Sequence, residues 1–185
     1  MQYNIFPTSF YWIHQLDNLE ELNEYVNSKT TIDNSGFSWG DACQVDRIPL
    51  KTQETLKYIN SAIVNFADST FNKRVGLNIY DPWVNLYSKG FHQEVHDHKN
   101  DFGVVIFLND GPDFSKFFFY NRYNNCVSNA MLDLFTEVTN QDIWYPEVKA
   151  GTILFFPGTL LHGVTPHNSN IVRKTLSFNM DIVPL

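Results

Sequence analysis

From residue 74 onward the chain is divided into short β-patterned segments, and this division limits the fold more than any other feature. Runs rich in β-branched and aromatic residues are separated by turn sequences such as Asp-Pro, Lys-Gly and Pro-Gly. The runs are RVGLNIY, WVNLYSK, FHQEVHDH, FGVVIFLN, KFFFY, GTILFFP and VRKTLSFNMDI. Many short strands joined by such turns predict a β-sandwich or barrel.

Two segments before residue 70 have helical periodicity instead. The first, DNLEELNEYVNSK, has Asp17 as its expected N-cap, and the second, PLKTQETLKYINSAIVNFADS, has Pro49 at its expected start. We therefore expect a mainly β fold, α+β by content, in which two surface helices pack on a sheet. The apolar faces that predict this packing are Leu19, Leu22, Tyr25 and Val26 in the first segment, and Leu56, Ile59, Ile63 and Phe66 in the second.

The length of 185 residues suits one domain. We expect residues 1–185 to form it, with helical support from residues 1–70 and the β core from residues 71–185. Between the two helical segments, TIDNSGFSWGDACQVD is rich in turn residues and predicts a long ordered loop, in which Trp39 is available as an anchor.

Charge and cysteine content limit the partners and the compartment. A formal charge of −7 repels phosphate backbones, so we do not expect sequence-independent binding of nucleic acid. Cys43 and Cys126 form neither a ligand pair nor a disulfide framework, which indicates a reducing compartment. No apolar run approaches the roughly 18 residues that a membrane span needs. We expect a soluble, cytoplasmic protein.

Potential metal ligands alternate in the stretch FHQEVHDHKND, where His92, Glu94, His96 and His98 are two residues apart. Positions i and i+2 of a strand face the same side, so His96 and His98 would project together, with His92 and Glu94 farther along that face. Two imidazoles placed this way can bind one cation. The alternative is an exposed polar edge strand whose histidines are solvated.

A third histidine and an arginine follow downstream. His162 comes shortly after the apolar strand that ends at Pro157 and Gly158, and Arg173 opens another β-patterned segment. A close histidine pair with a distant third ligand is typical of catalytic iron in jelly rolls, and a neighbouring arginine could bind a carboxylate through two hydrogen bonds. The alternative for Arg173 is an ordinary surface arginine.

Two stretches, WVNLYSKGFHQEVHDH and GTILFFPGTLLHGVTPHNSNIVRKTLSFN, resemble the iron(II)- and 2-oxoglutarate-dependent oxygenases, in particular the small prolyl-hydroxylase-like members. Members carry W-x-N, a glycine and then H-x-H or H-x-D, followed by G-x-(apolar)-F-P, a histidine and an arginine eleven residues beyond it. Weaker similarity extends to IFPT and SGFSWGD nearer the N-terminus. The resemblance implies a double-stranded β-helix, also called a jelly roll, in residues 71–185.

The resemblance also implies roles for single residues. His96 and His162 match the first and the distal metal ligand, and Arg173 matches the residue that binds the far carboxylate of 2-oxoglutarate. Asn85 and Tyr87 match co-substrate contacts of alkylation-repair members, although ordinary packing and hydrogen bonding in a strand is the alternative for both. The implied cofactors are Fe(II), the co-substrate 2-oxoglutarate and O2.

The third metal ligand departs from the family pattern. Most members have an aspartate where this chain has His98, and a carboxylate offsets the charge of iron in a way that a neutral imidazole does not. We favour His98 as the ligand, because its spacing from His96 suits a regular strand. Glu94, Asp97 and Asp101 are the alternatives, Asp97 only if a bulge re-aims the strand.

The implied reaction is hydroxylation of a C–H bond of a peptide or small molecule, with succinate and CO2 as co-products. His98 leaves no room for halide, which disfavours halogenation. The alternatives are a three-histidine, cupin-like dioxygenase or isomerase that needs no 2-oxoglutarate, and a non-catalytic jelly-roll binding protein. Neither substrate identity nor oligomeric state is predicted.

Residues outside the motifs receive milder interpretations. His14 is expected in a strand or turn near the N-terminus, and His167 is expected to be solvated in the TPHNSN loop. His92 would contact substrate or solvent. The segment NDGPDFSKFFFYNRYNNCVSNAMLDLF is expected to contribute a hairpin beside the substrate, with Arg122 and Tyr123 as candidate contacts, or else to form a solvated loop.

Overall fold

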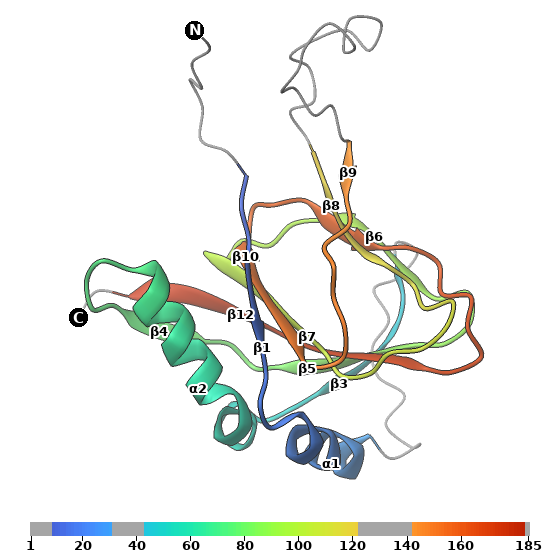
Figure 1. Cartoon of the computed structure of the whole chain (residues 1–185), viewed down its shortest axis with the longest axis horizontal. Coiled ribbons are helices and arrows are strands. Elements are labelled where there is room, and N and C mark those ends of the chain that lie inside the picture. Colours follow the sequence, from blue (N-terminus) through green and yellow to red (C-terminus); the bar gives the residue numbers. More distant parts are fainter. Residues whose placement is uncertain (1–8, 31–42, 122–141, 184–185) are drawn as a thin grey trace, which may run out of the picture.

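The computed structural model describes residues 9–30, 43–121 and 142–183, which form two helices and two antiparallel β-sheets (Figure 1). In chain order the elements are β1 (Trp12–Gln15), α1 (Leu19–Lys29), β2 (Cys43–Gln44), β3 (Asp46–Pro49), α2 (Thr52–Thr70), β4 (Gly76–Ile79), β5 (Trp83–Tyr87), β6 (His92–His96), β7 (Phe102–Phe107), β8 (Phe117–Tyr120), β9 (Ile143–Trp144), β10 (Thr152–Pro157), β11 (His162–Val164) and β12 (Arg173–Val183).

Within the described residues, the larger sheet has seven strands and the smaller has five. The larger runs β1-β10-β7-β12-β5-β3, with β4 also paired to β12, and the smaller runs β2-β6-β11-β8-β9. Strands distant in sequence are neighbours throughout, as in the pairing of β12 with both β5 and β7. The predicted mainly β, double-stranded β-helix fold with two supporting helices is confirmed.

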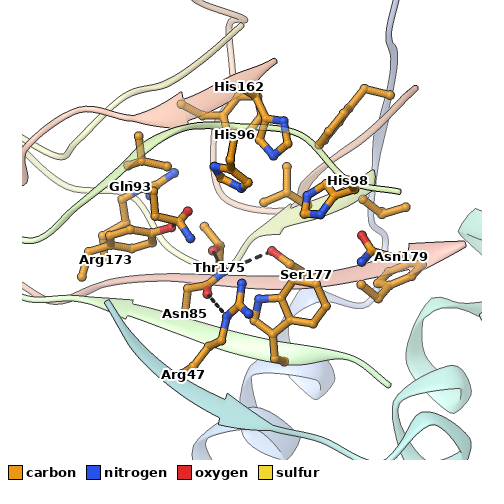
Figure 2. Close-up of a pocket in the computed structure, with 18 residues that line it drawn as sticks. Arg47, Asn85, Gln93, His96, His98, His162, Arg173, Thr175, Ser177 and Asn179 are labelled. Atoms are coloured by element: carbon orange, nitrogen blue, oxygen red, sulfur yellow. Dashed lines mark hydrogen bonds between the residues drawn. The ribbon is translucent and has the colours of Figure 1, made fainter. Parts of the chain in front are cut away.

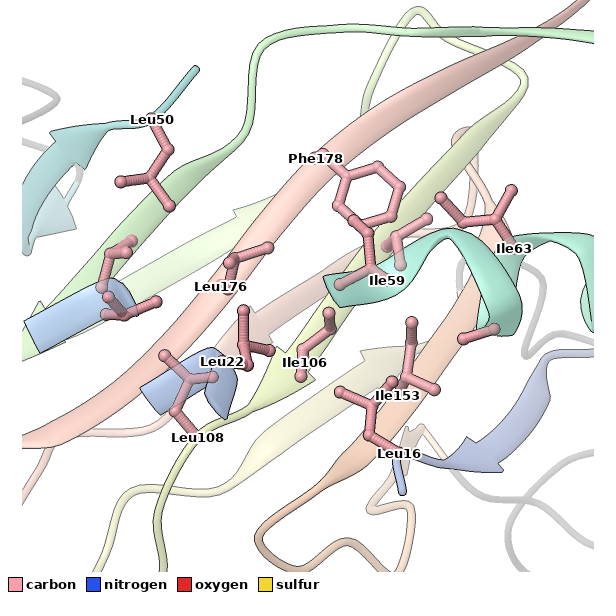
Figure 3. Close-up of a cluster of buried hydrophobic side chains, with 14 of the residues drawn as sticks. Leu16, Leu22, Leu50, Ile59, Ile63, Ile106, Leu108, Ile153, Leu176 and Phe178 are labelled. Carbon is pink, nitrogen blue, oxygen red and sulfur yellow. The ribbon is translucent and has the colours of Figure 1, made fainter. Parts of the chain in front are cut away.

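Both helices pack on the outer face of the larger sheet, as predicted (Figures 1 and 3). Strands β7 and β10 are buried on both faces, which explains their continuous apolar sequences. On β7, Ile106 packs toward the helices, whereas its neighbour Val105 packs in the second cluster, between the sheets. The helix-side cluster includes Leu22, Val26, Ile59, Ile63, Phe66, Ile153, Leu176 and Phe178.

The helix boundaries differ from the prediction. The N-cap of α1 is Asn18 rather than Asp17. The side-chain amide of Asn18 donates a hydrogen bond to the Tyr58 carbonyl and does not cap the helix. Pro49 ends β3, so α2 begins at Thr52. Proline is tolerated there because its missing N–H falls at the end of an edge strand, where no ladder bond is lost.

The first 70 residues supply strands as well as helices. Strands β1 and β3 lie at the two ends of the larger sheet, and β2 lies at one end of the smaller. Part of the predicted inter-helix loop is therefore β structure, in β2 and the start of β3. His14 lies in β1, where a strand or turn was expected.

Several predictions fall outside the described residues. They concern Trp39, Arg122, Tyr123, Cys126 and the whole SGFSWGD stretch. None of the helices in the described part of the chain has the length and apolar character that crossing a membrane requires.

Candidate metal centre

Three histidines converge between the two sheets (Figure 2). The potential ligand atoms of His96, His98 and His162 all lie within 4.8 Å of one another. Ring centroids are 4.3 Å apart for His96 and His162, 5.0 Å for His98 and His162, and 5.3 Å for His96 and His98. These separations suit three nitrogen ligands around one metal ion.

A bulge in β6 determines which of its side chains face the cluster. On β11, His162 pairs with His96 of β6, and Val164 pairs with Gln93. The distance from Gln93 to His96 is three residues, whereas that from His162 to Val164 is two, so β6 contains one extra residue. The predicted alternation is therefore wrong at this point. Gln93 is buried and faces the cavity with His96, whereas Glu94 is exposed. Sequence spacing gave no sign of this bulge.

His98 reaches the cluster from outside the strand. Strand β6 ends at His96, so the predicted regular strand through His98 is too long. The His98 backbone N–H donates to the Gly158 carbonyl at 2.8 Å, which holds this segment beside the end of β10. A Cβ at Gly103 would lie 2.6 Å from the Phe156 ring and 3.3 Å from the His98 ring, so Gly103 makes room for both.

Backbone carbonyls orient two of the imidazoles. His96 Nδ1 lies 2.8 Å from the Glu94 carbonyl oxygen, and His162 Nδ1 lies 2.9 Å from the Leu160 carbonyl oxygen. A carbonyl only accepts, so Nδ1 carries the proton in both rings and Nε2 keeps its lone pair for a metal.

Burial keeps the three rings neutral. It lowers the pKa of His96 and lowers that of His162 well below its usual value. Burial, then the electrostatic effects of His96 and Arg47, lower the pKa of His98 to about 4. A histidine must be neutral to bind a metal, so the cluster needs no deprotonation near pH 7.

The described carboxylates near the cluster do not join it. Glu94, Asp97 and Asp101 are exposed, and the group whose ligand atoms converge contains histidines alone. Asp101 instead accepts a hydrogen bond from the Ile182 N–H at 2.8 Å. The bulge lies before Asp97 and leaves His98 facing the cluster.

Arg173 is a buried cation in the same cavity. It is 3% exposed, and its Nη1 has no hydrogen-bond partner within the described part of the chain. Its guanidinium carbon lies 4.8 Å from the centre of the Tyr87 ring, and no ion pair to it forms among the described residues. A buried guanidinium of this kind is costly unless a ligand supplies an anion, so the site fits a carboxylate.

Tyr87 and Asn85, the candidate co-substrate contacts, both line the cavity. Burial raises the pKa of Tyr87 to about 12, so its hydroxyl stays protonated and donates to Gln93 Oε1 at 2.5 Å. The Asn85 amide donates to Thr175 Oγ1 and to Ser177 Oγ, each at 3.2 Å. Asn85 therefore organises neighbouring side chains.

Several cavity residues were not predicted. Four inward positions of β12 form a polar row, whereas the residues between them pack toward the helices. The alternation in RKTLSFNM could have revealed this row. Arg47 carried no signal, because it lies in a strand that was predicted as the end of a loop and the start of a helix. The unpredicted cavity residues include Arg47, Trp83, Gln93, Thr175, Ser177 and Asn179.

One of the other two histidines differs from its predicted setting, and the second is compatible with the solvent contact that was one of its alternatives. His167 is fully buried rather than solvated: its Nδ1 accepts from the Ser115 N–H at 3.1 Å, and its Nε2 donates to the Ile171 carbonyl at 2.8 Å. The first of these hydrogen bonds connects the segment before β12 to the segment before β8, and the second lies within the segment before β12. His92 is only partly buried and does not line the cavity.

The chain is similar to proteins of one known family and to solved structures. A model of the 2OG-Fe(II) oxygenase family, where 2OG is 2-oxoglutarate, matches residues 81–179. A prolyl-4-hydroxylase from Pseudomonas putida superposes with a TM-score of 0.65 at 13% identity, over 94% of this chain and 93% of that one. No curated protein sequence matches the chain.

Two further solved structures share the fold. A viral collagen prolyl hydroxylase from Paramecium Bursaria Chlorella virus-1, in complex with 2OG, has a TM-score of 0.62 at 14% identity, over 92% of this chain and 94% of that one. HygX from Streptomyces hygroscopicus, with nickel, 2-oxoglutarate and hygromycin B bound, has a TM-score of 0.64 at 10% identity, over 94% of this chain and 83% of that one.

Proposed function

Because the chain belongs to the 2OG-Fe(II) oxygenase family and is an iron(II)- and 2-oxoglutarate-dependent oxygenase, we propose that it hydroxylates a C–H bond of a peptide or small molecule. In this proposal His96, His98 and His162 hold the iron. Arg173 binds the far carboxylate of 2-oxoglutarate, and Tyr87 and Asn85 shape the space between them.

One observation carries the assignment of these roles. A buried Arg173 guanidinium, which has no ion-pair partner among the described residues, shares a cavity with three converging neutral imidazoles. Nitrogen ligands fit iron(II), and a guanidinium fork fits a carboxylate, so a single ligand with a carboxylate at each end could engage both. Neither group by itself would select 2-oxoglutarate.

The cofactors supply the oxidising chemistry: one oxygen atom of O2 enters the substrate C–H bond as a hydroxyl, and the other enters succinate as 2-oxoglutarate loses CO2. The chain's own residues bind and orient. The Glu94 and Leu160 carbonyls hold two of the imidazoles in the binding tautomer. Phe117, Phe156 and Val164 line the cavity with apolar surface that limits the access of water.

The substrate class has support from the solved neighbours. Two of them are prolyl hydroxylases, one of collagen, and HygX was solved with hygromycin B. Both a peptide and a small molecule are therefore compatible with this fold.

The test is release of CO2 and succinate from 2-oxoglutarate by iron(II)-loaded protein. We expect Arg173→Ala to raise the KM for 2-oxoglutarate by about tenfold or more, because loss of a charge-assisted pair costs about 1.5–3 kcal/mol. Arg173→Lys should retain part of the affinity, since it keeps the charge but loses the fork. The exposed Arg74 provides a matched control, and Arg74→Ala should leave the KM unchanged.

Thermal unfolding of each variant separates loss of binding from loss of fold. An unchanged KM for 2-oxoglutarate in a folded Arg173→Ala variant would contradict the role of Arg173. Product formation from a substrate without 2-oxoglutarate would instead favour the three-histidine dioxygenase chemistry.

A further inference from the structure

The charge of the cavity differs from that of the whole protein. The chain carries a formal charge of −7, yet the described residues that line the cavity include two arginines and no aspartate or glutamate. Three neutral imidazoles also leave the charge of a bound metal ion unbalanced. Of the two carboxylates of 2-oxoglutarate, one would bind at the metal and one at Arg173. The second arginine, Arg47, is assigned to neither of these carboxylates.

Arg47 lines the cavity from the larger sheet, at a different position along the strands from Arg173. On the larger sheet, Arg47 is paired with Asn85, and Asn85 with Thr175, whereas Arg173 pairs with Tyr87, two residues farther along β5. Figure 2 shows Arg47 reaching from β3 toward Asn85, below the histidines. The co-substrate contact and this second cation are therefore separate positions on one surface.

The Arg47 guanidinium is held in a defined orientation. Its carbon lies 4.4 Å from the centre of the Trp83 ring, and its Nε donates to Asn85 Oδ1 at 3.5 Å. The indole supports one face of the planar group, and Asn85 constrains its Nε edge. A preorganised guanidinium of this kind is suited to bidentate binding of a carboxylate.

Two polar atoms of residues that line the same side of the cavity are buried and have no hydrogen-bond partner among the described residues. They are Nε1 of Trp83, a donor, and Oδ1 of Asn179, an acceptor. Trp83 is paired with Ser177, and Asn179 is the next inward residue of β12, so both lie beyond Asn85 on the side away from Arg173. An unsatisfied buried polar atom costs about 1–3 kcal/mol, which a ligand with a matching acceptor and donor would recover.

We propose that the substrate is a small carboxylic acid with an N–H or O–H group beside the carboxylate, such as an amino acid or a 2-hydroxy acid. Its carboxylate binds Arg47 and accepts from Trp83 Nε1, and its N–H or O–H donates to Asn179 Oδ1. This inference rests on the proposed function, because it places the substrate in the same cavity as 2-oxoglutarate. A C-terminal residue of a peptide presents the same chemistry.

The test is calorimetric binding to protein loaded with Mn(II) and N-oxalylglycine, an unreactive analogue of 2-oxoglutarate. The probes are the L-amino acids and matching 2-hydroxy acids, each paired with its own carboxamide, and short peptides with free or amidated C-termini. We expect at least one acid to bind about tenfold or more tightly than its carboxamide, the ratio that a charge-assisted hydrogen bond provides. Tighter binding of free acids than of peptides identifies a small-molecule substrate, and the reverse identifies a peptide C-terminus and overturns the small-acid assignment.

Variants identify the residue responsible. In Arg47→Gln the preference for acid over carboxamide should fall to about one, whereas Arg47→Lys should retain part of it. Trp83→Phe keeps the stacked ring but removes the donor, so it should weaken binding of the acid more than that of the carboxamide. The exposed Arg74 again provides the control, and Arg74→Gln should keep the full preference.

Besides tighter binding of peptides, three outcomes overturn the inference: no acid binds, acids and carboxamides bind alike, or the preference survives in Arg47→Gln. Failure of the proposed function is recognised separately, because N-oxalylglycine itself would then not bind to the Mn(II) protein. In that case the acid and carboxamide pairs are titrated against the Mn(II) protein alone, and their ratio still decides the role of Arg47.

Discussion

At the scale of single residues, the third histidine distinguishes this centre from the aspartate-containing pattern of most of the family. His98 lies in the cluster, and the nearby carboxylates Glu94, Asp97 and Asp101 do not. A histidine adds no negative charge, so a metal here depends more on the charge of its other ligands. The two arginines of the cavity are consistent with this, since both favour anionic ligands.

Replacing His98 tests whether it is a ligand. His98→Ala should weaken Mn(II) or Fe(II) binding by more than about tenfold. Loss of a residue that only orients a metal ligand lowers metal affinity by about 10–100-fold, and loss of a direct ligand should lower it further. His98→Asp should bind the metal at least as well as the native protein, because a carboxylate can replace the imidazole. Metal titration under anaerobic conditions measures both.

His92 provides the control for that experiment. It lies on the same strand but outside the cavity, so His92→Ala should leave metal affinity unchanged. Undiminished affinity in His98→Ala would mean that a carboxylate or a residue outside the described part of the chain completes the site.

At the scale of elements, one face of β10 packs against α2 and stabilises the fold, whereas its other face contacts the metal centre. Phe155 stacks on Phe66 of α2, with ring centroids 4.2 Å apart and planes within 4° of parallel. Its neighbour Phe156 faces the opposite way, with its ring 4.7 Å from that of His162. The helix therefore stabilises the strand without touching the site.

Phe66→Ala should accordingly lower the free energy of unfolding by about 3–5 kcal/mol, because it removes a fully buried ring and leaves a cavity. Metal affinity of the remaining folded protein should change little. Urea unfolding and metal titration provide the two measurements.

Val64 on the same helix is 45% exposed, so Val64→Ala should change stability by less than about 0.5 kcal/mol and serves as the control. Equal effects of the two variants would contradict the packing described for α2.

At the scale of the whole molecule, the centre joins the two sheets. His96 and His162 lie on the smaller sheet, whereas Arg173, Asn85 and Arg47 lie on the larger one. A ligand that contacts the metal and Arg173 would therefore connect the sheets. Ligand binding should be coupled to the stability of the entire barrel.

Saturation with Mn(II) and 2-oxoglutarate should make this coupling visible in thermal unfolding. At a 2-oxoglutarate concentration of about 100 times its Kd, the free energy of unfolding should rise by about 2.7 kcal/mol. In Arg173→Ala the increment from 2-oxoglutarate at the same concentration should be much smaller, and that from Mn(II) should persist. An equal increment from 2-oxoglutarate in both proteins would mean that the two sheets are not connected through Arg173.

Much of this architecture was readable from local pattern. Turn sequences separated most of the strands, helical spacing identified the faces of α1 and α2, and His96, His98, His162 and Arg173 followed from motif spacing. These features depend on neighbours a few residues apart in the chain, where the geometry of a strand or helix relates position to direction.

Other features depended on contacts between distant segments. The bulge in β6 turns Gln93 rather than Glu94 inward, and it exists only in the pairing with β11. Arg47 enters the cavity because β3 pairs with β5, and His167 is buried because Ser115 and Ile171 surround it. The sequence by itself determined the fold class and the histidine motif of the proposed metal centre. The tertiary structure decided which polar side chains share the cavity, because strand register and the packing of remote segments are set by non-local contacts.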